Sequence, residues 1–124
     1  QMCIRDSSLD EPLTLKKDQV TAIPTGLSVE IPEGYELQVR ARSGLALKFG
    51  LTLVNGVGTI DSDYRGEIKV LVTLLSAKEL EIQSGDRIAQ ALISKTIPTE
   101  HVEVDSLSQT LRGSGGFGST GIRS

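Results

Sequence analysis

The chain has 124 residues, a length that suits one domain with one hydrophobic core. Its net charge is −3 and its 13 lysines and arginines form no run, which argues against the broad basic face of a nucleic-acid-binding protein. One cysteine and one histidine exclude an internal disulfide, a thiolate metal cluster and a multi-histidine site.

No stretch approaches the ~20 apolar residues that cross a bilayer, and no secretory signal is visible. We therefore expect a soluble, cytoplasmic protein with no membrane partner. Aromatic residues make up 3% of the chain, so the core must consist of valine, leucine and isoleucine. Such a core is thin for this length, and association with further copies of the chain would help to bury it.

The N-terminal stretch QMCIRDS fits nothing that follows, because it shows neither a strand nor a helix period. We expect residues 1–8 to be foreign sequence in place of a native N-terminus, and residues 9–105 to form a β domain. Residues 19–31 mix β-branched residues with Pro24 and Gly26, which favours an edge strand with a bend.

A turn is predicted at residues 31–34, with Pro32 at its second position and Gly34 at its fourth. Residues 35–42 then alternate strictly between apolar and polar side chains, as a half-buried strand does. The period changes at residues 43–50, which favour one or two helical turns with Ser43 as N-cap and Gly50 as the stop.

Further strands are predicted at residues 51–54 and 67–75, the second being apolar enough to be central in its sheet. Residues 79–97 form two strands joined at residues 84–86. The last segment, residues 106–124, is rich in serine and glycine and is expected to be a mobile arm. Short strands, Gly/Pro turns and one short helix together predict an all-β jelly roll or barrel.

Two stretches could bind an anion. Residues 41–46 end a strand and start a helix at Ser43-Gly44, where free N–H groups could meet a phosphate, although an ordinary N-cap explains them as well. The arm has five glycines between residues 112 and 121, together with Arg112, which can grip a phosphate, and Phe117, which can stack on a base. A disordered low-complexity tail is the alternative explanation for the arm.

The charged stretch at residues 57–70 holds Asp61 and Asp63, whose side chains would share one face of an extended segment. Two such carboxylates can bind Mg²⁺ or hold a water, and a charged turn before a strand is the simpler interpretation. Near the end of the domain, Gln90 follows the turn at residues 84–86 and could reach a phosphate oxygen.

Four stretches, ARSGLALKFGL, NGVGTIDSDYRGE, GDRIAQ and RGSGGFGSTG, resemble four of the five ordered motifs of the trimeric deoxyuridine triphosphatases (dUTPases). The resemblance covers roughly residues 12 to 121 and implies an all-β jelly roll that assembles as a homotrimer with active sites between subunits. It also implies the Mg²⁺-dependent hydrolysis of dUTP to dUMP and pyrophosphate, which keeps uracil out of DNA.

The resemblance assigns the nucleoside and the water to the third motif. Asp61 would be the catalytic residue that activates a water at the α-phosphorus. Tyr64 would lie under the deoxyribose and exclude a 2′-hydroxyl. Asn55, with backbone groups at Gly58 and Ile60, would bind the uracil edge.

The phosphates would be bound by the remaining motifs. Arg42, Ser43 and Gly44 would hold them at the second motif, and Gln90 would contact the α-phosphate region. In the arm, Arg112 would bind the γ-phosphate and Phe117 would stack on uracil. Residues Gly118, Ser119 and Thr120 would wrap the γ-phosphate. The charged residues Asp63, Arg65, Glu67, Asp86 and Arg87 are interpreted as structural supports.

One motif of the family is missing. An Ala-Gly-x-Asp-Leu-like run should precede residue 9, and residues 1–8 stand there instead. The family uses its aspartate to orient waters around Mg²⁺, so we expect the triphosphate to hold the metal and no side chain to ligate it directly. A non-catalytic or impaired dUTP-binding trimer is therefore one alternative. A dCTP deaminase is another, which the absence of an arginine shortly after Ser43 disfavours.

Overall fold

The computed structural model describes residues 2–5, 9–121 and 123, and this part of the chain forms strands with one short helix. The elements in chain order are β1 (Met2–Arg5), β2 (Leu13–Lys16), β3 (Thr21–Pro24), β4 (Tyr35–Ala41), α1 (Ser43–Phe49), β5 (Leu51–Leu53), β6 (Gly58–Ile60), β7 (Lys69–Leu74), β8 (Glu79–Ile82) and β9 (Arg87–Lys95). In the described residues, no helix has the length and apolar character needed to span a membrane.

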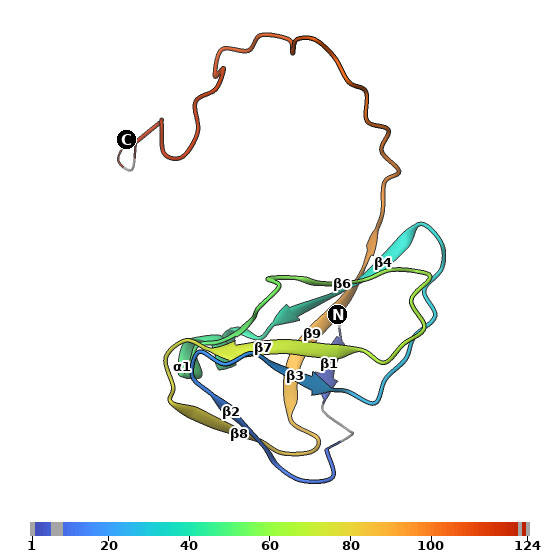
Figure 1. Cartoon of the computed structure of the whole chain (residues 1–124), viewed down its shortest axis with the longest axis vertical. Coiled ribbons are helices and arrows are strands. Elements are labelled where there is room, and N and C mark those ends of the chain that lie inside the picture. The colour runs from blue at the N-terminus through green and yellow to red at the C-terminus, as the bar shows by residue number, and fades with distance from the viewer. Residues whose placement is uncertain (1, 6–8, 122, 124) are drawn as a thin grey trace.

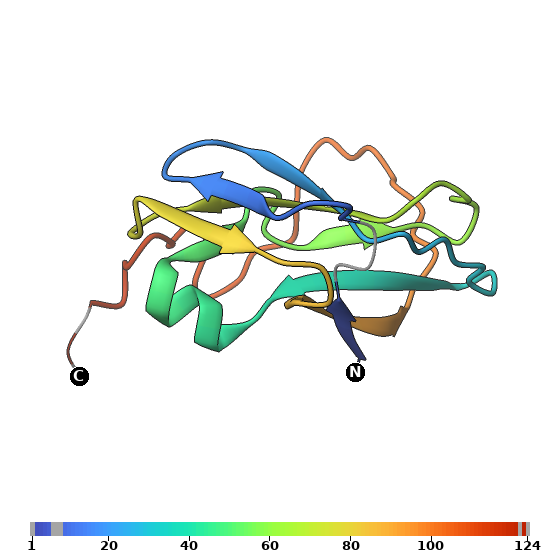
Figure 2. The ribbon, with the colours of Figure 1, turned by 90° about the horizontal axis from the view of Figure 1, so that it is seen from below.

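The strands lie in two layers (Figure 2). One layer is a four-stranded sheet in the order β1-β9-β4-β6, and the other combines the three-stranded sheet β3-β7-β5 with the two-stranded sheet β2-β8. All the strand pairs in these sheets are antiparallel. The expected all-β architecture with one short helix is confirmed, as are the edge position of β3 and the central position of β7.

The core between the layers is aliphatic, as the low aromatic content requires. Strands contribute alternate residues to it, for example Leu37 and Val39 of β4 and Val70, Val72 and Leu74 of β7. This period of two follows from the pleat, which sends successive side chains to opposite faces of a sheet. The outward face of β7 keeps Leu71 partly exposed, and Thr73 has a buried hydroxyl with no hydrogen-bond partner among the described residues.

Residues 2–5 form a strand, although the sequence shows no strand period there. Strand β1 pairs with β9, opposing Met2 to Ala91 and Ile4 to Ala89. Ile4 is 1% exposed and belongs to the core. Residues 1 and 6–8 lie outside the described part of the chain, and the foreign origin of residues 1–8 stays a prediction.

Two local predictions shift by one residue. The N–H of Tyr35 donates to the carbonyl of Pro32 (3.2 Å), so the turn starts at Pro32 and places Gly34, with φ +83°, at its third position. In α1 the N-cap is Arg42, whose backbone is extended, while Ser43 is already helical and makes no capping bond. Gly50 ends the helix in the left-handed conformation, as predicted.

Two turns connect strands of different sheets. The segment at residues 54–57 joins β5, which pairs with β7, to β6, which pairs with β4. The turn at residues 83–86 joins β8, which pairs with β2, to β9, which pairs with β4 and β1. The local sequence indicates a turn in each case. It does not indicate which strand the next segment pairs with.

Candidate functional site

The end of β4 and the start of α1 carry the first group of predicted site residues. Ser43 and Gly44 are exposed in the first helical turn, and a Cβ added to Gly44 would meet no atom within 4 Å. The Arg42 guanidinium donates to the carbonyl of Arg87 (2.7 Å), which ties this corner to the start of β9. The helix start is therefore open to a ligand and has a cation fixed beside it.

Gln90 joins this group through the sheet register. It lies opposite Arg40 on β4, and its side-chain amide donates to the carbonyl of Ala41 (3.3 Å). Gln90 thus meets Arg42, Ser43 and Gly44 at the carboxyl end of β4, although more than 40 positions of the sequence separate it from them. An arrangement of backbone N–H groups, a guanidinium and an amide is chemically suited to an anion such as a phosphate.

The segment from Asn55 to Ile60 forms the second group. A Cβ on Gly58 would lie 3.3 Å from the Val39 side chain and 3.5 Å from the Asn55 amide nitrogen, so glycine allows the close approach of both. Asn55, Gly58 and Ile60 line a small cavity of about 70 Å³ with residues of β4, β5 and β7. Asn55 is exposed, and its amide can both donate and accept hydrogen bonds at this opening.

Asp61 and Tyr64 lie together at a neighbouring cavity of about 250 Å³. The N–H of Tyr64 donates to the carbonyl of Asp61 (3.2 Å), and the Tyr64 hydroxyl donates to the carbonyl of Glu67 (2.9 Å). Tyr64 is 44% exposed, so one part of it is free to contact a ligand. An exposed carboxylate can hold a water, and the exposed part of an aromatic ring can pack on a ligand at the same cavity.

Four residues of this cavity were missing from the predicted site residues. They are Thr59, Glu67, Lys69 and Leu71, and all of them except Glu67 also line the smaller cavity at Asn55. The signal was present in the sequence, since residues 67, 69 and 71 alternate with the buried residues 68, 70 and 72 and must point away from the core.

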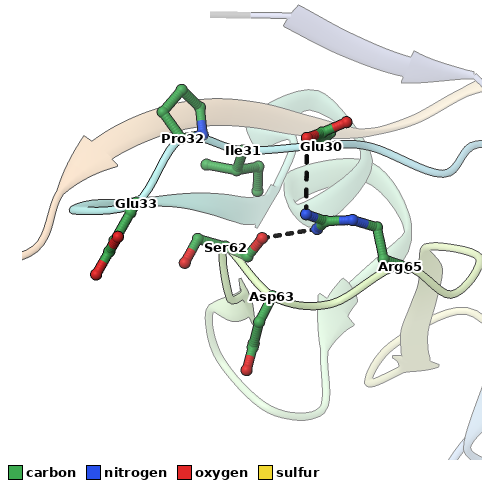
Figure 3. Close-up of a pocket in the computed structure, with 7 residues that line it drawn as sticks. All are labelled: Glu30, Ile31, Pro32, Glu33, Ser62, Asp63 and Arg65. Carbon is green, nitrogen blue, oxygen red and sulfur yellow. Dashed lines mark hydrogen bonds and ion pairs between the residues drawn. The ribbon is translucent and has the colours of Figure 1, made fainter.

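The two carboxylates Asp61 and Asp63 do not share one face, so that expectation is wrong. A turn at Ser62 and Asp63 replaces the extended segment and sends Asp63 to a different, open cavity of about 910 Å³. Figure 3 shows Arg65 pointing across that cavity toward Glu30 and the carbonyl of Ser62, while the Asp63 carboxylate points away from them.

The arm forms the third group and lies apart from the first two. Figure 1 shows the chain leaving both layers after β9 and arcing away from them. Arg112 donates to the carbonyl of Gly115 (2.6 Å), and Phe117 is fully exposed. Gly118, Ser119 and Thr120 form turns and are likewise exposed. In the described part of the chain, no arm residue lines the cavities at Asn55, Asp61 or Arg42.

Comparison with known proteins gives one consistent family. The family model for dUTPase matches residues 4–121. The deoxyuridine 5′-triphosphate nucleotidohydrolase of Treponema denticola is 57% identical over 114 residues, covering 92% of this chain and 79% of that protein. The enzyme of the same name from Finegoldia magna is 54% identical over 112 residues, covering 90% and 78%.

Solved structures agree with this result. The dUTPase of Staphylococcus bacteriophage 80alpha, determined with dUPNHPP, superimposes with a TM-score of 0.82 at 26% identity, covering 97% of this chain and 85% of that one. A mutant dUTPase of phage phi11 of S. aureus, described with a structural Mg(II) ion, has the same fold, with a TM-score of 0.69 at 22% identity and coverage of 88% and 92%.

Proposed function

The chain belongs to the dUTPase family, and we propose that it hydrolyses dUTP to dUMP and pyrophosphate. The observation that carries this proposal is the joint position of Asp61 and Tyr64 at one cavity, next to the Asn55 segment. These residues belong to the motif that resembles the family, in a chain 57% identical to a deoxyuridine 5′-triphosphate nucleotidohydrolase. That name also disfavours the dCTP deaminase alternative.

Within this site, Asp61 accepts the proton of a water that attacks the α-phosphorus in line with the departing pyrophosphate. Tyr64 packs under the deoxyribose and leaves no space for a 2′-hydroxyl. Asn55 and the backbone at Gly58 and Ile60 bind the uracil edge, and a cytosine would leave these polar groups wrongly paired. The exposed part of Tyr64 and the cavity shared with Lys69 support this placement.

The phosphates bind at the start of α1. Backbone N–H groups of Ser43 and Gly44 receive the anionic oxygens, with the Arg42 guanidinium beside them and Gln90 at the α-phosphate region. The open space at Gly44 and the anchoring of Arg42 on Arg87 support this role. The arm then closes over the nucleotide, with Arg112 at the γ-phosphate, Phe117 on the uracil ring and residues 118–120 around the γ-phosphate.

We propose Mg²⁺ as the cofactor, held mainly by the triphosphate. Mg²⁺ keeps several waters and commonly binds through substrate phosphates, where it neutralises their charge. In residues 2–5, 9–121 and 123, the structure gathers no group of three or more histidine, cysteine, aspartate or glutamate side chains that could hold a metal. The chain's own part is to place the phosphates, through Arg42 and the helix start.

We propose that the active unit is a homotrimer with sites shared between subunits, acting on the nucleotide pool of the cytoplasm. Three groups of site residues lie at separate places on one chain, and the arm is remote from the others, so neighbouring copies would complete each site. The exposed apolar residues Leu71 and Val54 lie on or beside the outward face of the β3-β7-β5 sheet, where a second subunit could cover them.

The direct test is pyrophosphate release from dUTP, dCTP, dTTP and UTP, each supplied with Mg²⁺. We expect turnover of dUTP alone, because the other three differ at the base or at the 2′ position. Binding of dUTP without pyrophosphate release would instead support the non-catalytic alternative. Release from dCTP at a comparable rate would contradict the uracil assignment of Asn55.

A further inference from the structure

We propose that Glu67 and Gly66 are positioning residues that hold the ring of Tyr64 in place, and thereby set the discrimination between deoxyribose and ribose. This inference rests on the proposed function, in which Tyr64 contacts the sugar. Glu67 lines the cavity with Tyr64 and Asp61.

The Glu67 carboxylate fastens the loop of Tyr64 to the end of β3. It accepts a hydrogen bond from the N–H of Gly26 (2.9 Å), 41 positions away in the sequence. A carboxylate that accepts from a backbone N–H makes a charge-assisted bond, which is stronger than a neutral one. Glu67 is partly buried as a residue, and the bond itself lies at the surface.

Ile68 adds two hydrogen bonds between the same two segments. The N–H of Ile68 donates to the carbonyl of Leu27 (2.8 Å), and its carbonyl accepts from the fully buried hydroxyl of Thr25 (2.6 Å). Residues 67–68 and 25–27 are thus joined by three bonds. The carbonyl of Glu67 lies on this fixed segment, and it is the acceptor for the Tyr64 hydroxyl (2.9 Å).

Gly66 provides the room that this hydroxyl bond needs. A Cβ at residue 66 would overlap the Tyr64 hydroxyl and come within 2.6 Å of the ring carbon that carries it. The φ of Gly66 is not among the positive values, so glycine is required here by the tyrosine and not by the backbone. Any larger residue must push the ring away from Glu67.

The Arg65 side chain makes weaker contacts in the same loop. It donates to the carbonyl of Ser62 (2.7 Å), within the loop itself, and lies 3.9 Å from the Glu30 carboxylate (Figure 3). Both side chains of that ion pair are more than half exposed, and such pairs contribute little. The attachment through Glu67 is therefore the one that determines where the ring of Tyr64 lies.

The position of the ring matters because the sugars differ by one hydroxyl. A ring that shifts by about 1 Å can cost roughly a hundredfold in a well-oriented step, and it also opens the space from which the 2′-hydroxyl is excluded. Loss of the Glu67 carboxylate should therefore lower kcat/KM for dUTP more than kcat/KM for UTP.

The first test compares kcat/KM for dUTP and for UTP in Glu67→Ala, Glu67→Gln and Gly66→Ala, with Glu79→Ala on β8 as the matched control. We expect the dUTP-to-UTP ratio to fall about tenfold or more in Glu67→Ala and Gly66→Ala. Glu67→Gln keeps a carbonyl oxygen for the Gly26 N–H and should recover most of the ratio. Glu79 lies opposite Lys16 in the β2-β8 sheet, so its variant should keep the full ratio.

The second test measures the mobility and solvent exposure of the Tyr64 ring directly. The chain has two tyrosines and no tryptophan, so Tyr35→Phe leaves Tyr64 as the single fluorescent tyrosine. In that background, Glu67→Ala should lower the tyrosine fluorescence anisotropy and raise quenching by acrylamide, while Glu67→Gln should not. This measurement needs no substrate, so it tests the attachment even if the wild-type chain fails to hydrolyse dUTP, which would instead overturn the proposed function.

Two results would overturn the inference. One is an unchanged anisotropy of Tyr64 in folded Glu67→Ala. The other is an equal loss of kcat/KM for dUTP and UTP, which would mean that Glu67 stabilises the fold without positioning the ring.

Discussion

Asp61 is the residue on which the proposed hydrolysis depends, and its surroundings fit that role. The residue is exposed and lines the cavity next to Tyr64, while its carbonyl accepts the N–H of Tyr64 and closes the turn. The backbone therefore holds the two side chains together, and a change confined to the carboxylate should leave the turn intact.

We predict that Asp61→Asn keeps nucleotide affinity and loses about 10²- to 10⁴-fold in turnover, because an amide cannot accept the proton of the attacking water. Pyrophosphate release and calorimetric binding of a non-hydrolysable dUTP analogue measure the two effects separately. Asp63→Asn is the matched control and should retain turnover, since Asp63 lies at the other cavity. Normal turnover in Asp61→Asn would refute the assignment of the base.

At the level of single elements, β1 is the least expected part of the fold. It covers one side of β9, the strand that carries Gln90 to the phosphate corner, and it places Ile4 in the core. The opposite side of β9 pairs with β4. Strand β1 thus helps to fix the element on which the candidate phosphate site is built.

We predict that Ile4→Ala lowers the free energy of unfolding by about 2–5 kcal/mol, the usual cost of truncating a fully buried isoleucine. Chemical denaturation at one fixed protein concentration gives this value and avoids the mass-action effect of oligomerisation. Cys3→Ala, at the exposed neighbouring position, should change stability by no more than about 0.5 kcal/mol. Equal effects of the two substitutions would show that β1 does not contribute to the core.

At the level of the whole molecule, the arm and the two layers are separate parts. The arm begins beyond the last strand and makes hydrogen bonds within itself, as between Arg112 and Gly115. Leu111 and Phe117 in the arm are fully exposed. It can therefore move or be removed without disturbing the packing between the sheets.

We predict that deletion of residues 112–124 lowers turnover of dUTP about a hundredfold, because it removes the groups that close over the nucleotide. The oligomer should persist, as judged by sedimentation equilibrium. His101→Gln, earlier in the same extended segment, is the control and should behave as the wild type. Dissociation of the oligomer after the deletion would contradict the assignment of these residues as a lid.

The local features of this protein could be predicted from its residues alone. The alternation at residues 35–41, the central apolar strand β7, the stop at Gly50 and the order of the motifs were all visible without coordinates, because each depends on neighbours within a few residues. The all-β class and the family followed from them. The composition of the core also followed, since the chain offers almost no aromatic residues.

The contacts between distant segments could not be predicted from the sequence, and only the three-dimensional structure shows them. There β1 lies on β9, a turn separates Asp61 from Asp63, and Glu67 binds Gly26. The physical reason is that strand pairing and side-chain attachment across 40 or more positions depend on the packing of the two layers, which no local period encodes. For the same reason, only the structure distinguishes the roles of the charged stretch at residues 61–67. Asp61 is an exposed carboxylate, Tyr64 supplies the ring beside it, and the Glu67 carboxylate attaches the loop to Gly26.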